Sequence, residues 1–273
     1  MELLGLFGQG IDKSYSPAIH SAALRESGRK GQYMLWPVEE ADLHGAMRGA
    51  YLLGARGANV TTPHKEAAAL LCTRLDPWAR RIGAVNVLVR GEGGWIGHNT
   101  DADGFWQPIA AVGRPVREAL VLGTGGAALA VCAALEREGV RLHVAGRNRE
   151  KLGRFAIEFR AQTLDWQGWT GLHGLDLIVN ATTLGGRPGE SPLAEHDIPE
   201  GIILYDLLYR PAPTELQQRA LRRGCRVLGG NGMLLAQALL AWRLWYGEQP
   251  PHRAMAAALD AAMQADAARD KGE

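Results

Sequence analysis

The sequence Val121-Leu122-Gly123-Thr124-Gly125-Gly126-Ala127-Ala128 decides the predicted fold of this chain. A short apolar run ends there in three glycines within four residues. The next segment, residues 129–135, is rich in Ala and Leu, which is typical of a helix. A second apolar run follows at residues 142–145. The order apolar run, glycine turn, helix and apolar run predicts a β-α-β unit.

The glycines also have the spacing of a nucleotide-binding turn. Gly123-x-Gly125-x-x-Ala128 fits the dinucleotide fingerprint, which allows Ala in the third place. The first two glycines permit a tight turn and let the backbone approach a pyrophosphate, which the amides at the helix N-terminus can hold. We therefore expect residues of this turn to bind the cofactor, namely Gly123, Thr124, Gly125, Gly126 and Ala127.

The end of the second apolar run, about 20 residues beyond the glycines, selects between NAD and NADP. An NAD enzyme usually has Asp or Glu there, whereas this chain has Gly146-Arg147-Asn148-Arg149-Glu150-Lys151. The cluster of Arg147, Arg149 and Lys151 suits a 2′-phosphate, and the Arg147 guanidinium can donate two parallel hydrogen bonds. The segment favours NADP(H), bound by Arg147, Asn148 and Lys151; a solvated first helical turn is the alternative.

Composition narrows the range of partners. A chain of 273 residues with 47% hydrophobic and 22% charged residues is long enough for two globular domains. Its 30 basic and 29 acidic residues give no indication of a nucleic acid or an anionic membrane. The sequence has neither a signal-peptide pattern nor an apolar stretch of membrane-spanning length. The 3 cysteines are expected to be core residues in a reducing cytoplasm, and the 8 histidines lack metal-ligand spacing, so no metal is predicted.

Alternating apolar runs and helical segments predict an α/β fold with mostly parallel strands. Pro17 is expected in the first turn of a helix that Ser16 caps. Strands are predicted at residues 3–8, 33–36, 56–60, 84–90, 95–97, 175–179, 202–206 and 225–228. Helices are predicted at residues 18–27, from 38, at 63–72, through 105–109, and at 214–223, 233–246 and 252–267.

Seven short motifs, in this order, resemble those of the shikimate dehydrogenase family and together cover nearly the whole chain. They are Ser14-x-Ser16-Pro17, Asn59-Val60-Thr61-x-Pro63-x-Lys65, Gly83-Ala84-Val85-Asn86, Asn99-Thr100-Asp101-x-x-Gly104, Gly123-x-Gly125-Gly126-Ala127, Asn180-Ala181-Thr182 and Gly232-Met233-Leu234-x-Ala236-Gln237.

The resemblance implies a domain organisation and an activity. A substrate-binding domain would comprise residues 1–101 and 231–273, with a Rossmann-type NADP-binding domain inserted at 102–230. The implied reaction is the reversible NADPH-dependent reduction of 3-dehydroshikimate to shikimate, a step towards chorismate and the aromatic amino acids. The partners would be this small cyclic polyol carboxylate and the cofactor, in a monomer or homodimer.

Reduction of a ketone by hydride builds negative charge on the carbonyl oxygen, so the site needs a proton donor. Lys65 opens a predicted helix, where the helix dipole disfavours a cation, so a chemical role fits it better than a structural one. The resemblance assigns Lys65 as the general acid and Asp101 as its partner. A surface lysine and a helix-capping aspartate are the alternatives. His64 could also carry a proton, although a partly exposed His at a helix start is the commoner case.

The resemblance also assigns residues to the substrate. Ser14 and Ser16 would donate to its carboxylate, and Tyr209 matches a family tyrosine near that group. Side chains that both donate and accept suit ring hydroxyls, and these are Thr61, Asn86 and Gln237. The alternatives are a helix cap for Ser16 and hydrogen bonds at strand ends for Thr61 and Asn86.

A last group of residues would lie near the nicotinamide half of the cofactor. Asn180, Ala181 and Thr182 would face that half, and Gly230 and Met233 would lie near the ring. Met233 alone would otherwise be assigned to the core.

Some positions depart from the family pattern. Tyr15 stands where Lys is usual, Gly146 where Asn is usual and Asn148 where Thr is usual; His64 and Asn231 also differ. These changes leave open a paralogue that acts on quinate or an amino-substituted shikimate, with NAD as an alternative cofactor. A non-enzymatic NADP-binding regulator is a third reading.

Overall fold

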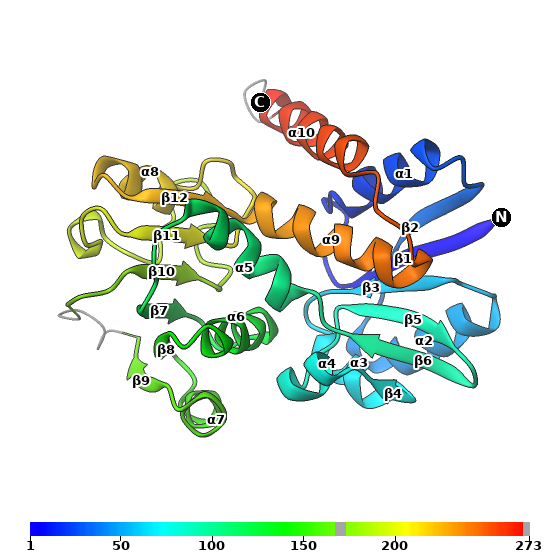
Figure 1. Ribbon diagram of the computed structural model, residues 1–273, viewed down its shortest axis with the longest axis horizontal. Helices are drawn as coiled ribbons and strands as arrows, with labels where there is room; N and C mark the ends of the chain where they lie inside the picture. Colours follow the sequence, from blue (N-terminus) through cyan, green and yellow to red (C-terminus); the bar gives the residue numbers. More distant parts are fainter. Residues whose placement is uncertain (167–172, 270–273) are drawn as a thin grey trace. The chain divides into compact units, whose positions relative to one another are not determined.

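The computed structural model describes residues 1–166 and 173–269 (Figure 1). The chain divides into two compact units, which we call the first unit (Met1–Thr100 and Leu235–Glu273) and the second unit (Asp101–Leu234). Both units combine helices with a six-stranded sheet, so the predicted α/β class is confirmed.

The sheet of the first unit has the order β2-β1-β3-β5-β6-β4. Its strands are β1 (Glu2–Gly8), β2 (Gly31–Pro37), β3 (Gly57–Val60), β4 (Arg74–Leu75), β5 (Val87–Gly91) and β6 (Gly94–His98). Strand β5 runs antiparallel to both of its neighbours, and the other pairs are parallel. The helices are α1 (Ser16–Glu26), α2 (Leu43–Leu52), α3 (Lys65–Leu71), α4 (Pro77–Ile82) and α10 (His252–Arg269), joined by the final turns of α9 (Gly230–Tyr246).

The core of the first unit depends on apolar side chains that alternate along the strands and recur along the helices. Phe7, Met47, Leu88 and Trp95 are buried in one cluster between the sheet and α2. On β3, a Cβ atom added at Gly57 would lie 2.2 Å from the indole nitrogen of Trp245. Glycine is therefore required there for the close approach of α9 to the sheet.

The first helix begins differently from the prediction. Its N-cap residue is Tyr15 and no side chain caps it, so the expected Ser16 cap is wrong. Ser16 is instead the first helical residue, and its backbone N–H donates to the Ser14 hydroxyl over 3.2 Å. The helix expected from residue 38 also begins later, because a 3₁₀ turn at Glu40–Asp42 precedes α2.

The second unit has an entirely parallel sheet of order β12-β11-β10-β7-β8-β9. Counted from β7, this order is 6-5-4-1-2-3, as in dinucleotide-binding folds. Its strands are β7 (Glu118–Leu122), β8 (Arg141–Gly146), β9 (Gln162–Asp165), β10 (Leu177–Asn180), β11 (Ile203–Asp206) and β12 (Arg226–Gly229). Its helices are α5 (Asp101–Val112), α6 (Gly126–Arg137), α7 (Arg149–Phe159) and α8 (Glu215–Arg222), with the first turn of α9.

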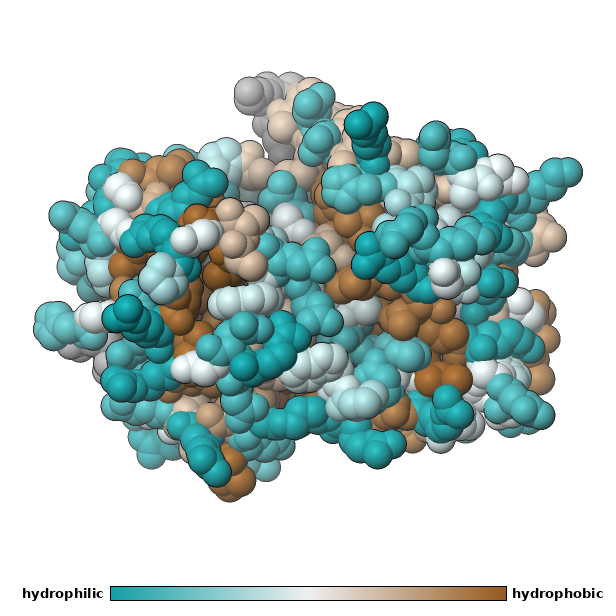
Figure 2. All heavy atoms as spheres, viewed as in Figure 1, coloured by the Kyte–Doolittle hydropathy of each residue, from teal (hydrophilic) through white to brown (hydrophobic). Residues whose placement is uncertain are grey.

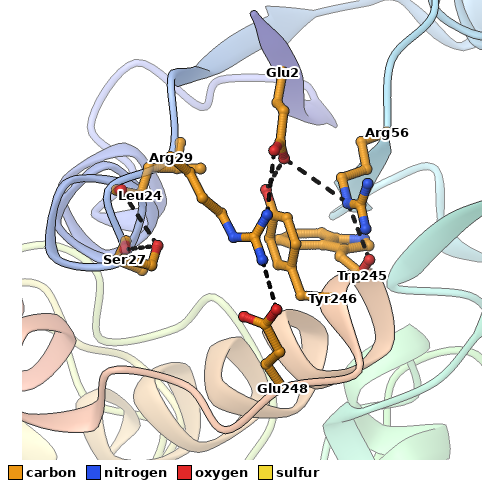
Figure 3. A network of polar contacts seen from close by, with 9 residues as sticks. Glu2, Leu24, Ser27, Arg29, Arg56, Trp245, Tyr246 and Glu248 are labelled. Carbon is orange, nitrogen blue, oxygen red and sulfur yellow. Dashed lines mark hydrogen bonds and ion pairs between the residues drawn. The ribbon is translucent and has the colours of Figure 1, made fainter.

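Within the first unit, a cluster around Tyr246 holds the C-terminal segment to the N-terminal part of the chain (Figure 3). The guanidinium groups of Arg29 and Arg56 flank the Tyr246 ring, 4.1 and 4.4 Å from its centre. The Tyr246 hydroxyl donates to Glu2 over 2.6 Å, and Arg29 also pairs with Glu248 at 2.8 Å. Cation–π contacts and ion pairs thus join β1, the loop before β2 and the end of α9. Helix α10 then packs along α1.

Much of the face shown in Figure 2 is hydrophilic, with apolar residues between the polar ones. The large apolar side chains with substantial exposure include Leu53 (80%) and Leu70 (88%). Among the described residues, no helix is long and apolar enough to cross a membrane. Cys132 and Cys225 are buried, Cys72 is partly buried, and all three are free thiols.

His20 on α1 should make the stability of the first unit depend on pH. Its ring is fully buried and stacks on Tyr33 with centroids 4.5 Å apart, and burial lowers its pKa from 6.5 to about 3. Above pH 6.5 it is neutral in both folded and unfolded chains. Below that pH the unfolded chain binds a proton that the folded chain excludes. Because of His20, we expect the free energy of unfolding to fall by up to about 1.4 kcal/mol for each unit by which the pH is lowered below 6.5.

Urea unfolding between pH 7.5 and pH 5 measures this effect, since His20→Phe retains an aromatic ring and removes the titration. The pH dependence should be shallower in His20→Phe than in the wild type, whereas His44→Gln, at an exposed position, should keep the wild-type slope. Equal slopes in the wild type and His20→Phe would contradict the assignment.

Candidate functional site

The carboxyl ends of β7 and β10 form the first part of the site, in the second unit. These strands are neighbours where the strand order reverses, which is where open α/β sheets bind ligands. Gly123, directly after β7, has φ +114°, and a Cβ atom there would lie 2.9 Å from the Ala181 carbonyl oxygen. Gly123 therefore must be glycine, and its turn lies against the Asn180-Ala181-Thr182 loop.

The turn after β7 leads into the N-terminus of α6. Gly125 is the N-cap residue and has no Cβ atom over the first turn, and α6 begins at Gly126. The first backbone N–H groups of a helix have no intrahelical partner, and the dipole is positive at this end. With Thr124 and Ala127 alongside, this end of the helix suits a pyrophosphate.

The end of β8 lies beside the same turn. A Cβ atom added at Gly146 would be 2.7 Å from the Thr124 methyl group, so the glycine leaves room for the threonine side chain. Asn148 caps α7, where its side chain accepts from the Lys151 N–H over 2.9 Å. Arg147 is exposed, and Arg149 pairs with Asp165 at 3.3 Å. The structure thus brings Thr124 and Gly146 together.

Asn180 and Thr182 form a tightly bonded loop at the end of β10. The Asn180 side-chain oxygen accepts from the Thr182 hydroxyl over 2.7 Å and from the Thr182 N–H over 3.1 Å. The Asn180 side-chain amide donates to the Leu184 carbonyl over 3.0 Å. These side-chain bonds fix the loop conformation beyond the end of the sheet pairing, where the Ala181 N–H still donates to the Leu122 carbonyl over 2.9 Å.

Gly230, Met233 and Tyr209 complete the predicted residues of the second unit. A Cβ atom at Gly230 would lie 2.0 Å from the Leu207 carbonyl oxygen, so only glycine allows this contact between the start of α9 and the segment after β11. Met233 is 9% exposed. Tyr209 is half-buried, and burial raises the pKa of its hydroxyl, which therefore remains a hydrogen-bond donor at neutral pH.

The first unit contains a buried polar network that links three of the predicted substrate residues. The Tyr33 hydroxyl donates to the Asn59 side chain over 2.7 Å. Burial raises the pKa of Tyr33, and a hydrogen bond with the Ser16 side chain opposes that rise. The Asn59 amide donates in turn to the Asn86 carbonyl oxygen over 3.2 Å. Ser16 on α1 is thereby connected to the strand ends of the sheet.

The network continues from Asn86 to α9. The Asn86 side chain donates to the Thr100 hydroxyl over 3.0 Å and accepts from the Thr100 N–H over 2.8 Å. The Thr100 hydroxyl donates to the Gln237 carbonyl oxygen over 3.2 Å. The motifs already contained Asn59, the partner of Tyr33, and Thr100, the partner of Asn86, but no functional role was predicted for Tyr33, Asn59 or Thr100. A polar residue within or directly after an apolar strand was the available signal for each.

The remaining predicted residues of this site lie at the ends of elements. Ser14 and Thr61 are partly exposed loop residues, and the Thr61 N–H donates to the Phe7 carbonyl over 2.9 Å. Lys65 is the partly buried first residue of α3. Asp101, 4% exposed, is the first residue of α5 and directly follows Thr100 in the chain.

His64 differs from its expected environment. It was expected to be partly exposed, but its side chain is 1% exposed, so that expectation is wrong. Its Nε2–H donates to the Val38 carbonyl over 2.7 Å, and this contact ties α3 to the segment after β2. A buried ring with this bond has a structural role that accounts for its position.

No group of three or more His, Cys, Asp or Glu side chains within residues 1–166 and 173–269 could hold a metal ion. Among the predicted site residues, the first unit offers amides, hydroxyls and the cation of Lys65, and the second unit offers amides, hydroxyls, backbone N–H groups and the cation of Arg147. Such groups suit anionic and polyhydroxylated organic ligands.

Comparison with known proteins relates this arrangement to enzymes. A family model described as the shikimate dehydrogenase substrate binding domain matches residues 6–88. A shikimate dehydrogenase (NADP(+)) of Thermosynechococcus vestitus is 39% identical over 96% of this chain and 96% of its own length.

Two solved structures extend the comparison. Shikimate 5-dehydrogenase of Thermus thermophilus, in complex with NADP(H) and shikimate, is 37% identical with a TM-score of 0.88, covering 96% of this chain and 100% of that one. Quinate dehydrogenase of Corynebacterium glutamicum, in complex with NAD, is 31% identical with a TM-score of 0.87, covering 95% and 99%.

The contact between Thr124 and Gly146 can be tested by a double-mutant cycle. Gly146→Ala should overpack the contact and reduce the free energy of unfolding by roughly 1–3 kcal/mol, because the threonine methyl has few alternative rotamers. In a Thr124→Ser background, which lacks the methyl group, the same substitution should cost much less. Urea unfolding of the four proteins gives the coupling energy. Equal costs in both backgrounds would exclude the contact.

Proposed function

This chain belongs to the shikimate dehydrogenase family, and from that premise we propose that it catalyses the reversible NADPH-dependent reduction of 3-dehydroshikimate to shikimate. The observation that carries the proposal is the similarity to shikimate dehydrogenases over 96% of the chain, across both units. The two clusters of predicted residues, one polar network in the first unit and one glycine turn in the second, support it. The cytoplasmic location expected from the cysteines, and a monomer or homodimer, belong to the same proposal.

In this proposal each unit binds a different ligand. The first unit binds the cyclic polyol carboxylate, and the match of residues 6–88 to a substrate-binding domain supports this assignment. The second unit binds NADP(H) at the carboxyl ends of its parallel strands. Arg147 carries the selectivity for the 2′-phosphate, and the amides at the start of α6 carry the pyrophosphate.

The chemistry assigned to the chain is proton transfer and charge stabilisation. NADPH, when bound, supplies the hydride that reduces the ketone. Lys65 donates a proton to the oxygen on which negative charge develops, and Asp101 stabilises the ammonium form of Lys65. In the direction of shikimate oxidation, Lys65 accepts the proton from the hydroxyl.

Substrate recognition uses neutral groups around that pair. Ser14 and Ser16 donate to the carboxylate together with Tyr209. Thr61, Asn86 and Gln237 both donate to and accept from the ring hydroxyls. Because the network from Tyr33 to Thr100 holds Ser16 and Asn86, these groups keep their orientation before substrate arrives, which lowers the entropic cost of binding.

A quinate dehydrogenase is the second candidate function. Two observations favour it: the similarity to the NAD-bound quinate dehydrogenase and the glycine at position 146, where the family usually has Asn. Initial rates with shikimate and quinate, each with NADP⁺ and NAD⁺, separate the two. Shikimate with NADP⁺ should give the highest kcat/KM. Dominance of quinate would establish the second candidate, and NADPH binding without turnover would indicate a regulator.

Lys65→Ala should lower kcat by roughly 10²–10⁴, the range for loss of a general acid or base. The free energy of unfolding should change little, because Lys65 is a partly exposed first residue of a helix. Stopped-flow or steady-state rates of NADPH oxidation measure the effect. Lys30→Ala, at an exposed position, is the matched control and should retain wild-type rates. Full activity in Lys65→Ala would refute the assigned role.

Arg147→Ala should weaken NADPH binding by roughly 10-fold or more, while NADH binding stays nearly constant, because only NADPH offers a 2′-phosphate to the guanidinium. Isothermal titration with both cofactors measures the ratio. Arg149→Ala provides the comparison, since Arg149 is already paired with Asp165. Equal losses for the two cofactors in Arg147→Ala would show that this residue does not read the phosphate.

A further inference from the structure

Asp206, the last residue of β11, is a carboxylate with no exposed surface. Its Oδ1 accepts from the Asn180 side-chain amide over 2.9 Å and from the Leu208 N–H over 3.2 Å. Its Oδ2 accepts from the Thr214 hydroxyl over 2.5 Å. Burial raises the pKa of Asp206, and these three hydrogen bonds oppose the rise. A carboxylate in this position is costly to desolvate, so its bonds must be well formed.

The first of these bonds fixes the loop after β10. An Asn side chain can turn over and exchange its oxygen and nitrogen. Here the nitrogen of Asn180 faces Asp206 and the Leu184 carbonyl, and its oxygen faces both donors of Thr182. Only one orientation satisfies all of these contacts, because Asp206 supplies an acceptor and no donor. The carboxylate thereby reinforces the orientation of the Asn180 amide that the Leu184 carbonyl and the Thr182 N–H also require, and it ties this amide to β11.

The second bond fixes the segment after β11. The Leu208 N–H donates to Asp206, and the Leu207 N–H donates to the Asn180 carbonyl over 3.1 Å. The Leu208 carbonyl in turn accepts from the Gly230 N–H over 3.3 Å, at the start of α9. The third bond reaches Thr214, the N-cap residue of α8. Asp206 therefore joins three segments at the carboxyl ends of the parallel strands: the loop after β10, the segment after β11 and the start of α8.

We propose that Asp206 is a positioning residue for the nicotinamide half of the cofactor. It acts through Asn180, Thr182 and the 207–209 segment, and it does not itself touch the cofactor. This inference rests on the proposed function of the second unit. The adenosine half would be bound by other groups, the turn at 123–127 and Arg147, whereas the carboxylate of Asp206 accepts from Asn180, Leu208 and Thr214. Loss of the carboxylate should therefore affect the two halves of the cofactor unequally.

Asp206→Asn is the sharpest test, because it keeps the size of the side chain and replaces one acceptor with a donor. The new amide nitrogen would face either the Asn180 amide and the Leu208 N–H, which are both donors, or the Thr214 hydroxyl, which already accepts from the Gln217 N–H over 3.2 Å. In either orientation at least one of the three bonds that hold this side chain is lost. We expect NADP⁺ to bind roughly 10-fold more weakly, whereas 2′,5′-ADP, which lacks the nicotinamide half, binds within about 2-fold of wild type. Isothermal titration of the full chain measures both dissociation constants.

Asp176→Asn is the matched control. This carboxylate accepts from the backbone N–H groups of Arg117 and Glu118 over 2.8 and 3.1 Å, at the amino end of the same sheet. Its ratio of NADP⁺ to 2′,5′-ADP affinity should equal that of the wild type, whatever happens to its melting temperature. If Asp206→Asn does not fold, Thr214→Val, which removes one donor to the carboxylate, should shift the ratio in the same direction.

The outcomes are distinct. A selective loss of NADP⁺ affinity supports the positioning role. Equal losses for both ligands, or no loss in Asp206→Asn, would overturn it while leaving the proposed function intact. A wild-type chain that binds neither ligand would overturn the positioning role together with the proposed function.

Discussion

Polar side chains that are removed from water must find partners inside the protein, and this constraint determines both candidate sites. Asn86 is 3% exposed and Thr100 is 5% exposed, yet each bonds to the other through two contacts. Each buried donor or acceptor of the amide that lost its partner would lower the free energy of unfolding by about 1–3 kcal/mol. The network therefore has one arrangement of low energy. A binding surface built on it is formed in advance of the ligand.

In the second unit the same constraint acts on loops that the sheet brings together. All pairs of its strands are parallel, so their carboxyl ends share one edge. Side chains at β10 and β11 that would otherwise be unrelated in sequence, Asn180 and Asp206, become neighbours at 2.9 Å. The sheet supplies proximity and the hydrogen bonds supply orientation. Mutating a loop residue that has no contact with ligand can therefore alter binding through its neighbours.

The elements that could be predicted from sequence are those with a strong pattern. The β7-α6-β8 unit has apolar runs, a glycine turn and a long helical segment, and the structure confirms it. The two-residue strand β4 and the strand β9 were missed, because each lies at a sheet edge and has no continuous apolar run. Edge strands need not be apolar on both faces, so composition does not reveal them.

The site residues were predictable to a different extent. Glycines such as Gly123 leave a local signal, because the positive φ of +114° that requires glycine belongs to the residue's own backbone. The partners of a buried polar group lie far away in the chain, as Tyr33 and Asn59 do, 26 residues apart. The N-cap of α1, which is Tyr15 where Ser16 was predicted, was missed for a similar reason. The sequence favours Ser16 as the cap, and only the turn geometry decides that the Ser14 hydroxyl accepts from the Ser16 N–H.

The end of β8 in the second unit shows how a departure from the family pattern, Gly146, can be accommodated by a neighbouring turn. Position 146 carries no side chain, and the space that a Cβ atom would need is taken by the methyl group of Thr124. A larger residue at position 146 could add a contact to the adenosine end of a dinucleotide, but here the threonine occupies that volume from the glycine turn. The volume next to position 146 is therefore filled by a side chain of the turn after β7 and not by a side chain of β8. Because Arg147 follows directly and is exposed, its guanidinium remains available to a 2′-phosphate. Under the proposed function, we expect preference for NADP to depend on the charge of Arg147 and not on the residue that precedes it.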